Sequence, residues 1–284
     1  MDKENNHLNQ LNRRQWISKA SAVSASVVTT CACLGGCRST PVTGRRQLIL
    51  VPESQEMALG MQAFQKTVQN EAPSQNARLV SMVKRVGQRI ASVAGRDDFQ
   101  WEFHLIGSDQ QNAFCLPGGK VAVYEGILPI CVDEAGLAVV MSHEIAHALA
   151  RHGGERMSQT MVVDGAKRVA SQLAGKYIPN KQAILMQAYG VGTKYGVLLP
   201  YNRRQESEAD EIGLTLMAHA GYDPTVAPAF WNRFGELKGA ATAEFLSTHP
   251  SDQRRSADLL KKMDAATTIY RSAPDKLGRG EGIA

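Results

Sequence analysis

The stretch MSHEIAHALARH, residues 141–152, contains residue types that can bind a metal ion and activate water. His143 and His147 are four positions apart, which places both imidazoles on one face of an α-helix. Both rings can then bind one ion, and Glu144 can reach a water molecule on that ion. The pattern predicts a zinc hydrolase site that needs a third protein ligand from elsewhere and one open position for water.

The acidic pair in ESEAD, residues 206–210, is the best candidate for completing this site. Glu206 and Asp210 share a helix face, so Glu206 can bind the metal while Asp210 accepts a hydrogen bond from the second ring nitrogen of a ligand histidine. Taken alone, Glu206 would better suit a solvated surface; the histidine motif upstream favours the ligand. Glu208 is expected to point away from this face, and Gly213 allows the two helices to approach closely.

Two positions near the histidine motif are poor alternatives for the third ligand. A site with a third histidine six residues after His147 is excluded, because Gly153 stands there. His152 is nine residues from His143, so a continuous helix would turn it about half a turn away from the metal-binding face.

These residues predict hydrolysis by a metal-activated water. His143, His147 and Glu206 would hold one Zn²⁺ per chain, which lowers the pKa of bound water and polarises a carbonyl. Glu144 would take the proton from that water and return it to the leaving amine.

A further donor is expected to stabilise the oxyanion. The stretch STHPSDQRR offers His249, with Arg255 one and a half helical turns beyond. His219 is an alternative, although its place at a helix end suits interaction with the helix dipole.

Apolar periodicity predicts the elements that position these residues. Helices are expected from Pro52, over residues 75–94, from Asp133 to about His152, over residues 203–221, from Asp223, and from Ser251 to about Ala265. Strands are expected over residues 101–107 and 112–116, with a third after the Pro-Gly-Gly turn. Residues 155–199 are expected to cover the domain with one or two helices and a loop.

Two of these helices carry an apolar stripe that is expected to face the core. The stripe of the first comprises Met57, Met61, Phe64 and Val68. The stripe of the second comprises Leu79, Met82, Val83, Val86 and Ile90. In the helix of the histidine motif, Asp133 is expected to cap the start, and Gly153-Gly154 the end.

The strand formed by Asn112, Ala113, Phe114 and Cys115 is the candidate substrate-binding element. Its Pro-Gly-Gly ending suits an edge strand, to which an extended peptide can add through backbone hydrogen bonds. An ordinary hairpin explains the same spacing equally well.

The N-terminus has the order of an export signal. Arg13 and Arg14 precede Trp16 and an apolar run without acidic residues, which resembles a twin-arginine signal. The run ends in LGGC, where Cys37 matches the lipidated cysteine of a lipobox. A soluble signal peptide with an incidental cysteine is the alternative. The absence of aspartate after Cys37 favours an outer-membrane anchor in the periplasm.

These features predict four segments: an export signal over residues 1–36, a lipid-anchored tether over 37–52, a peptidase domain over 53–265, and a flexible tail over 266–284. Cys115 and Cys131 are the cysteines left in the predicted domain, either as free thiols or as one bridge.

The composition of the 284 residues is that of a globular protein, with 43% hydrophobic and 21% charged residues. The formal charge is +5; omitting the four basic and two acidic residues of positions 1–36 leaves +3. A nucleic-acid partner is not expected, because aromatic–basic interleaving and zinc-finger spacing are both absent. No apolar run reaches the length of a transmembrane helix.

Five stretches, PVTGRRQLILV, NAFCLPGGKVAVYEGIL, SHEIAHALARHGGER, ESEADEIG and STHPSDQRR, occur in the order found in bacterial periplasmic zinc metallopeptidases of family forty-eight. The chain resembles the BepA-like and LoiP-like members, which are related to HtpX and the CAAX prenyl proteases. The resemblance covers roughly residues 41–265.

This resemblance implies an α+β, predominantly helical gluzincin: a zincin-like metallopeptidase domain with a small β-sheet. It implies His143, His147 and Glu206 as zinc ligands, Glu144 as the base, and Asp210 as a residue that supports a ligand. His249 and Arg255 match the histidine and arginine of the last motif; the histidine can block the water position or assist the transition state.

The resemblance also implies misfolded or stalled cell-envelope proteins as substrates. Relatives of the BepA kind carry C-terminal helical repeats, which do not follow the predicted peptidase domain in this chain. The alternative function is a latent zinc-binding chaperone or assembly-binding protein with little proteolysis. The presence of Glu144 favours the enzyme, because a binding protein needs no base there.

Overall fold

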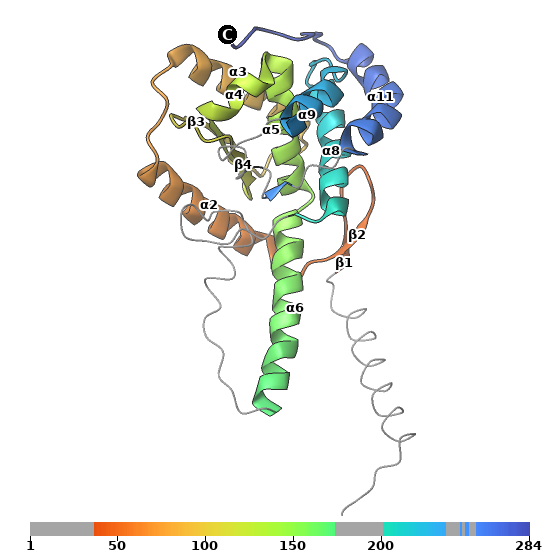
Figure 1. Cartoon of the computed structure of the whole chain (residues 1–284). Coiled ribbons are helices and arrows are strands. Elements are labelled where there is room, and N and C mark those ends of the chain that lie inside the picture. The colour runs from red at the N-terminus through yellow and green to blue at the C-terminus, as the bar shows by residue number, and fades with distance from the viewer. Residues whose placement is uncertain (1–36, 174–200, 237–244, 246–247, 250–253) are drawn as a thin grey trace, which may run out of the picture.

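The fold places helices around a small sheet, in a computed structural model that describes residues 37–173, 201–236, 245, 248–249 and 254–284 (Figure 1). The expected α+β, predominantly helical architecture is confirmed. The expected export signal, the covering segment from residue 174 onward and the cap at Ser251 lie outside the described residues. Among the described residues, no helix has the length and apolar character that a bilayer crossing requires.

The sheet has three strands: β3 (Glu102–Ile106), β4 (Ala113–Leu116) and β5 (Lys120–Tyr124). Their spatial order is β3-β5-β4, with β3 parallel and β4 antiparallel to β5. The turn between β4 and β5 needs two residues with positive φ, and glycine supplies both, at Gly118 and Gly119. Because β4 comes last in the spatial order of the strands, it lies at an edge of the sheet, as its sequence predicts.

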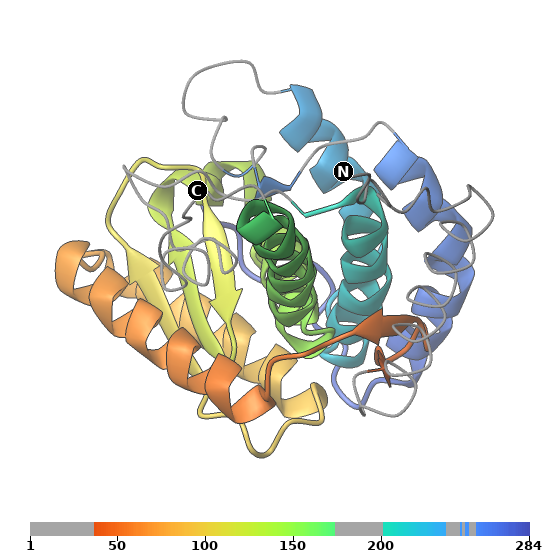
Figure 2. The ribbon, with the colours of Figure 1, turned by 90° about the horizontal axis from the view of Figure 1, so that it is seen from below.

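Helix α5 (Glu134–Leu149) occupies the centre of the domain. The side chain of Asp133 caps it by accepting a hydrogen bond from the amide of Gly136 at 2.9 Å. All of its residues from Glu134 to Ala148 are buried, because α3 (Ala77–Val93) and β4 cover one side and α8 (Arg203–His219) covers another. Figure 2 shows α5 between the sheet and α8.

The stripe predicted for the second helix is confirmed in α3, which buries Met82, Val83, Val86 and Ile90 and packs Leu79 against the same core. The stripe predicted for α2 (Glu53–Asn70) is wrong apart from Phe64: the buried face comprises Glu56, Gly60, Ala63, Phe64 and Thr67. Two contacts turn the helix this way. Glu56 forms a buried ion pair with Arg151, and a side chain at Gly60 would collide with Pro117.

Helix α5 ends earlier than the glycines at 153 and 154 predict. The break falls at Arg151, whose φ of 53° is left-handed, and α6 (His152–Leu173) then continues through both glycines. Arg151 is held in this costly conformation by its ion pair with Glu56 at 2.5 Å and by a hydrogen bond to the carbonyl of Val51. Figure 1 shows α6 projecting from the body of the domain.

Both ends of the described chain differ from the predicted segments. Residues 37–52 form part of the domain, because β1 (Cys37–Ser39) and β2 (Arg46–Leu48) make an antiparallel hairpin that buries Gln47 and Ile49. The predicted flexible tail is also corrected. Helix α11 (Arg254–Ser272) extends past residue 265, and the amide of Ile283 donates to the carbonyl of Val132.

Three shorter or later elements complete the described fold: a 3₁₀ turn (Glu125–Ile127), α4 (Leu128–Cys131) and α9 (Val226–Glu236). Helix α9 begins three residues after Asp223, whose side chain accepts from the amide of Thr225. Of the two alternatives for Cys115 and Cys131, the structure has free, buried thiols.

The crossing of α5 and α8 requires a glycine at position 213. A Cβ at Gly213 would lie 3.0 Å from the backbone nitrogen of His143. We therefore expect Gly213→Val to lower the free energy of unfolding by about 1–3 kcal/mol through overpacking. Urea unfolding of the zinc-free protein measures this. Gly235→Val is the matched control, since a Cβ there meets no atom within 4 Å; equal losses for the two variants would contradict the close crossing.

Candidate metal centre

Helices α5 and α8 bring the predicted zinc ligands together in the interior. The Nε2 atoms of His143 and His147 lie 3.1 Å apart. Glu206, from the first turn of α8, places Oε1 3.4 Å from His147 Nε2 and Oε2 3.5 Å from His143 Nε2. All three side chains are buried. The third ligand predicted from the ESEAD stretch thus lies where the two histidines need it.

The geometry and chemistry of this group fit zinc. Ligand atoms about 2.0–2.1 Å from a tetrahedral zinc ion lie roughly 3.3 Å from one another, close to the separations found here. Glu206 Oε2 is buried and makes no hydrogen bond of good geometry among the described residues, although Nη1 of Arg255 lies 3.0 Å away. A buried oxygen in this state is suited to a metal ion. Burial lowers the pKa of His147 well below its usual value, which favours the neutral form that binds metal. Burial also acts to lower the pKa of His143, but its hydrogen bonds with Asp210 and Glu206 raise that pKa to about 9, so a metal ion would displace a proton there.

The ionisation of Glu206 also suits a ligand. Burial alone would raise its pKa, but the neighbouring His249, His143 and His147 hold the pKa well below its usual value. The carboxylate form, which binds metal, is thereby maintained.

His249 lies against the same group of ligand atoms. Its Nδ1 is 3.3 Å from His143 Nε2 and 3.0 Å from Glu206 Oε1, and its Nε2 is 3.5 Å from Glu144 Oε1. The four ligand atoms of His143, His147, Glu206 and His249 lie within 4.8 Å of one another. His249 therefore stands where a fourth ligand or a reacting water would be, whereas the alternative donor His219 is an exposed residue at the end of α8.

Glu144 has the surroundings of an unengaged base. Burial raises its pKa, and the charges of His249 and His143 offset part of that rise. Its Oε1 is buried without a hydrogen-bond partner. The carboxylate is thus held beside the ligand group, and among the described residues no arginine or lysine forms a salt bridge with it.

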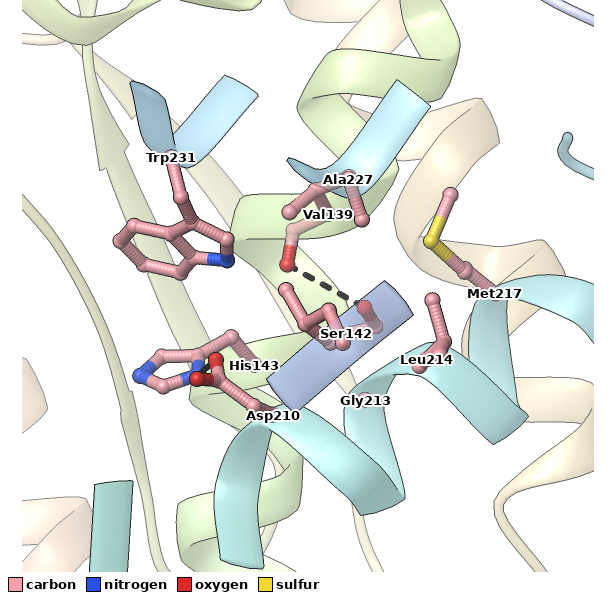
Figure 3. A pocket seen from close by; sticks show the side chains of 10 residues that line it. Val139, Ser142, His143, Asp210, Gly213, Leu214, Met217, Ala227 and Trp231 are labelled. Atoms are coloured by element: carbon pink, nitrogen blue, oxygen red, sulfur yellow. Dashed lines mark hydrogen bonds and ion pairs between the residues drawn. The ribbon is translucent and has the colours of Figure 1, made fainter. Parts of the chain in front are cut away.

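Asp210 holds His143 from the side opposite the ligand atoms. Its Oδ1 lies 3.0 Å from His143 Nδ1, as the spacing with Glu206 predicts, and Figure 3 shows the carboxylate beside the ring. Arg255 donates to both oxygens of Asp210, at 2.7 and 2.8 Å, and its Nη1 lies 3.0 Å from Glu206 Oε2. Its guanidinium also covers Trp231. These contacts are those of a positioning residue; the direct catalytic role of Arg255 stays a prediction.

Two aromatic neighbours of the ligands, His152 and Tyr201, could not be predicted from the spacing of residues in the sequence. His152 Nδ1 lies 2.9 Å from His147 Nδ1, although a continuous helix would have turned this side chain away. The ring centroid of Tyr201 lies 3.8 Å from that of His147, and the residue precedes α8 without any motif. The break at Arg151 places His152 there.

The predicted substrate strand lies beside the site. Strand β4, with Ala113, Phe114 and Cys115, packs against α5 and forms the sheet edge just after Asn112. Cys115 is near enough to Glu144 for that carboxylate to add to the rise that burial causes in the thiol pKa. The position suits an added peptide strand; the role itself stays a prediction.

Comparisons with known proteins agree with this geometry. The model of peptidase family M48 matches residues 74–263, a range that contains the four grouped residues. The mitochondrial metalloendopeptidase OMA1 of Schizosaccharomyces pombe is 37% identical, over 76% of this chain and 63% of its own length. OMA1 of Saccharomyces cerevisiae is 30% identical, over 82% and 71%. The β-barrel assembly-enhancing protease of Escherichia coli is 28% identical, over 72% and 43%.

Removing the charge at position 210 tests the support of His143. We expect Asp210→Asn to weaken zinc binding roughly 10- to 100-fold, because the histidine loses a charged acceptor and Arg255 loses its counter-ion. Competition with a chromophoric chelator measures the affinity. Glu211→Gln, one residue further and paired with Lys262 near the surface, is the control. Unchanged affinity in Asp210→Asn would remove this residue from the site.

Proposed function

The chain belongs to peptidase family M48, and from this premise we propose that it is a zinc-dependent endopeptidase. One observation carries the proposal. His143, His147 and Glu206 converge in the interior. The carboxylate of Glu144 lies beside them, with Oε1 3.5 Å from His249 Nε2 and without a hydrogen bond of good geometry among the described residues. A site that only bound zinc for stability would have no need for this fourth group.

The residues of the chain divide the reaction between them. His143, His147 and Glu206 would hold the ion, which when bound supplies Lewis-acid polarisation and a lowered water pKa. Glu144 takes the proton from the attacking water and delivers it to the leaving amine nitrogen. His249 then has a donor nitrogen close to the oxygen of the tetrahedral intermediate.

The substrate is proposed to be an unfolded or misassembled protein of the cell envelope. An extended peptide would add to the free side of β4, with backbone hydrogen bonds that demand little of its sequence. The similarity to the β-barrel assembly-enhancing protease supports this class of substrate. The similarity to the mitochondrial metalloendopeptidase OMA1 is equally compatible with protein substrates.

The proposed location follows from the first 37 residues. Twin arginines at 13 and 14 would direct export, and lipidation of Cys37 would hold the enzyme on the periplasmic side of a membrane, by our interpretation the outer one. Cys37 is the first residue that the structure describes, and it is also the first residue of β1. The anchor would therefore hold the catalytic domain close to the lipid surface.

A latent zinc-binding protein is the second candidate, and the position of His249 favours it. A histidine that fills the fourth ligand position would exclude the reacting water. The same contact would make the enzyme inactive until His249 moves. Comparison of the wild type with a Glu144 variant distinguishes an active enzyme from a latent zinc-binding protein.

Glu144→Gln tests catalysis directly. We expect cleavage of unfolded casein to fall at least 10²- to 10⁴-fold, since general-base catalysis is lost. Zinc content should stay at one ion per chain, because Glu144 is not a ligand. Glu211→Gln is the matched control and should cleave normally. Equal cleavage by Glu144→Gln and wild type would refute the mechanism, and zinc binding without cleavage by either would favour the latent protein.

Cys37→Ser tests the anchor. In the expressed full chain, we expect wild type in the membrane fraction and the variant in the soluble periplasmic fraction, because the acyl chains are lost. Cys33→Ser should remain with the membrane. Wild-type protein in the soluble fraction would show that Cys37 is not lipidated.

A further inference from the structure

We propose that His152 is a positioning residue for the zinc ligand His147, and that the N-terminal hairpin completes its support through Glu208. The inference rests on the zinc site proposed above. It assigns a role to three features that the mechanism leaves unused: the break after α5, the buried Glu208, and the turn between β1 and β2.

The break after α5 places His152 against its target. Arg151 has a left-handed conformation, so α6 starts in a new direction and returns His152 to the ring of His147. The two rings meet edge to face with centroids 4.9 Å apart, and their Nδ1 atoms are 2.9 Å apart. His152 is completely buried, so water does not compete for this hydrogen bond.

The positions of the hydrogens follow from zinc binding. If His147 binds the ion through Nε2, the neutral ring carries its hydrogen on Nδ1 and donates it to His152 Nδ1. His152 must then carry its own hydrogen on Nε2. That nitrogen lies 3.0 Å from Glu208 Oε2, a carboxylate oxygen that accepts it. Glu208 thus fixes the tautomer of His152, and His152 fixes the tautomer and orientation of His147.

Glu208 is itself held by the N-terminal hairpin. The hydroxyl of Thr40 donates to Glu208 Oε1 at 2.5 Å, and the hydroxyl of Thr43 donates to the same oxygen. Arg45 donates from Nε to Glu208 Oε2 at 2.5 Å. Its two terminal nitrogens each lie 2.7 Å from an oxygen of Glu155. The turn between β1 and β2, which the sequence predicts as part of a tether, therefore encloses the buried carboxylate of Glu208.

The two ligand histidines are supported by the same kind of chain of hydrogen bonds. His143 contacts Asp210, which contacts Arg255. His147 contacts His152, His152 contacts Glu208, and Glu208 contacts Arg45. In each case an arginine holds a carboxylate; the carboxylate contacts His143 directly and His147 through His152. The second chain is longer by one imidazole, and it reaches the segment that begins at Cys37.

The experiment measures zinc affinity in the full mature chain. Competition with a chromophoric chelator gives the dissociation constant, the visible spectrum of the Co²⁺-loaded protein reports the ligand geometry, and thermal unfolding of the metal-free protein reports stability. His152→Phe keeps a buried ring but has no nitrogen. His152→Asn loses volume but keeps an acceptor near the place of Nδ1.

We expect His152→Phe to weaken zinc binding roughly 10- to 100-fold and to shift the cobalt spectrum, because His147 loses its acceptor. His152→Asn should bind zinc within a few-fold of wild type, even where its metal-free stability is lower. If zinc affinity instead followed the stability of the two variants, His152 would only fill space, and the proposal would be overturned.

The hairpin is tested with neighbouring arginines. Arg45→Leu should weaken zinc binding several-fold through Glu208, whereas Arg46→Leu, at an exposed position on β2, should leave it unchanged. Equal affinities for Arg45→Leu and wild type would exclude the hairpin from the support of the site. A wild-type chain that binds no zinc would refute the proposed function itself, which separates that failure from failure of this inference.

Discussion

The burial of ionisable side chains at the crossing of α5 and α8 is the constraint on which the rest of the structure depends. His143, Glu144 and His147 lie on a helix that is covered on several sides. Glu206 reaches them from α8, which packs closely against α5 because residue 213 is a glycine. Isolated polar groups in such surroundings are costly unless they are paired or bind a metal. In this domain the cost is offset by ligand atoms grouped so that they can bind zinc, and by hydrogen bonds that link each ligand histidine to a charged residue.

Those partners explain why the contacts around the site are so specific. A ligand histidine must present the correct nitrogen, so its other nitrogen needs a defined acceptor. Asp210 provides it for His143, and Arg255 holds Asp210 while it also contacts Glu206. The N-terminal hairpin and the start of α6 supply the corresponding partners for His147. A segment far away in sequence thus becomes part of the metal centre.

The sequence could predict the elements whose cause is local. The i, i+4 spacing places His143 with His147 and Glu206 with Asp210, and the structure brings the two pairs together. The stripe of α3 was also predictable, because its apolar residues recur at helical spacing. The face of α2 was not, since a buried ion pair between Glu56 and Arg151 overrides its apolar pattern. His152 was missed for the same reason: the helix breaks at Arg151 through a tertiary contact, and no spacing rule shows it.

The central claim is that one zinc ion binds to His143, His147 and Glu206, with both rings fixed by their second nitrogens. A crystal structure of the zinc-loaded chain, with anomalous data at the zinc edge, tests it most directly. The account predicts a single peak about 2.0–2.2 Å from Nε2 of both histidines and from a carboxylate oxygen of Glu206. A peak elsewhere, or one bound through Nδ1 of His147, would contradict it.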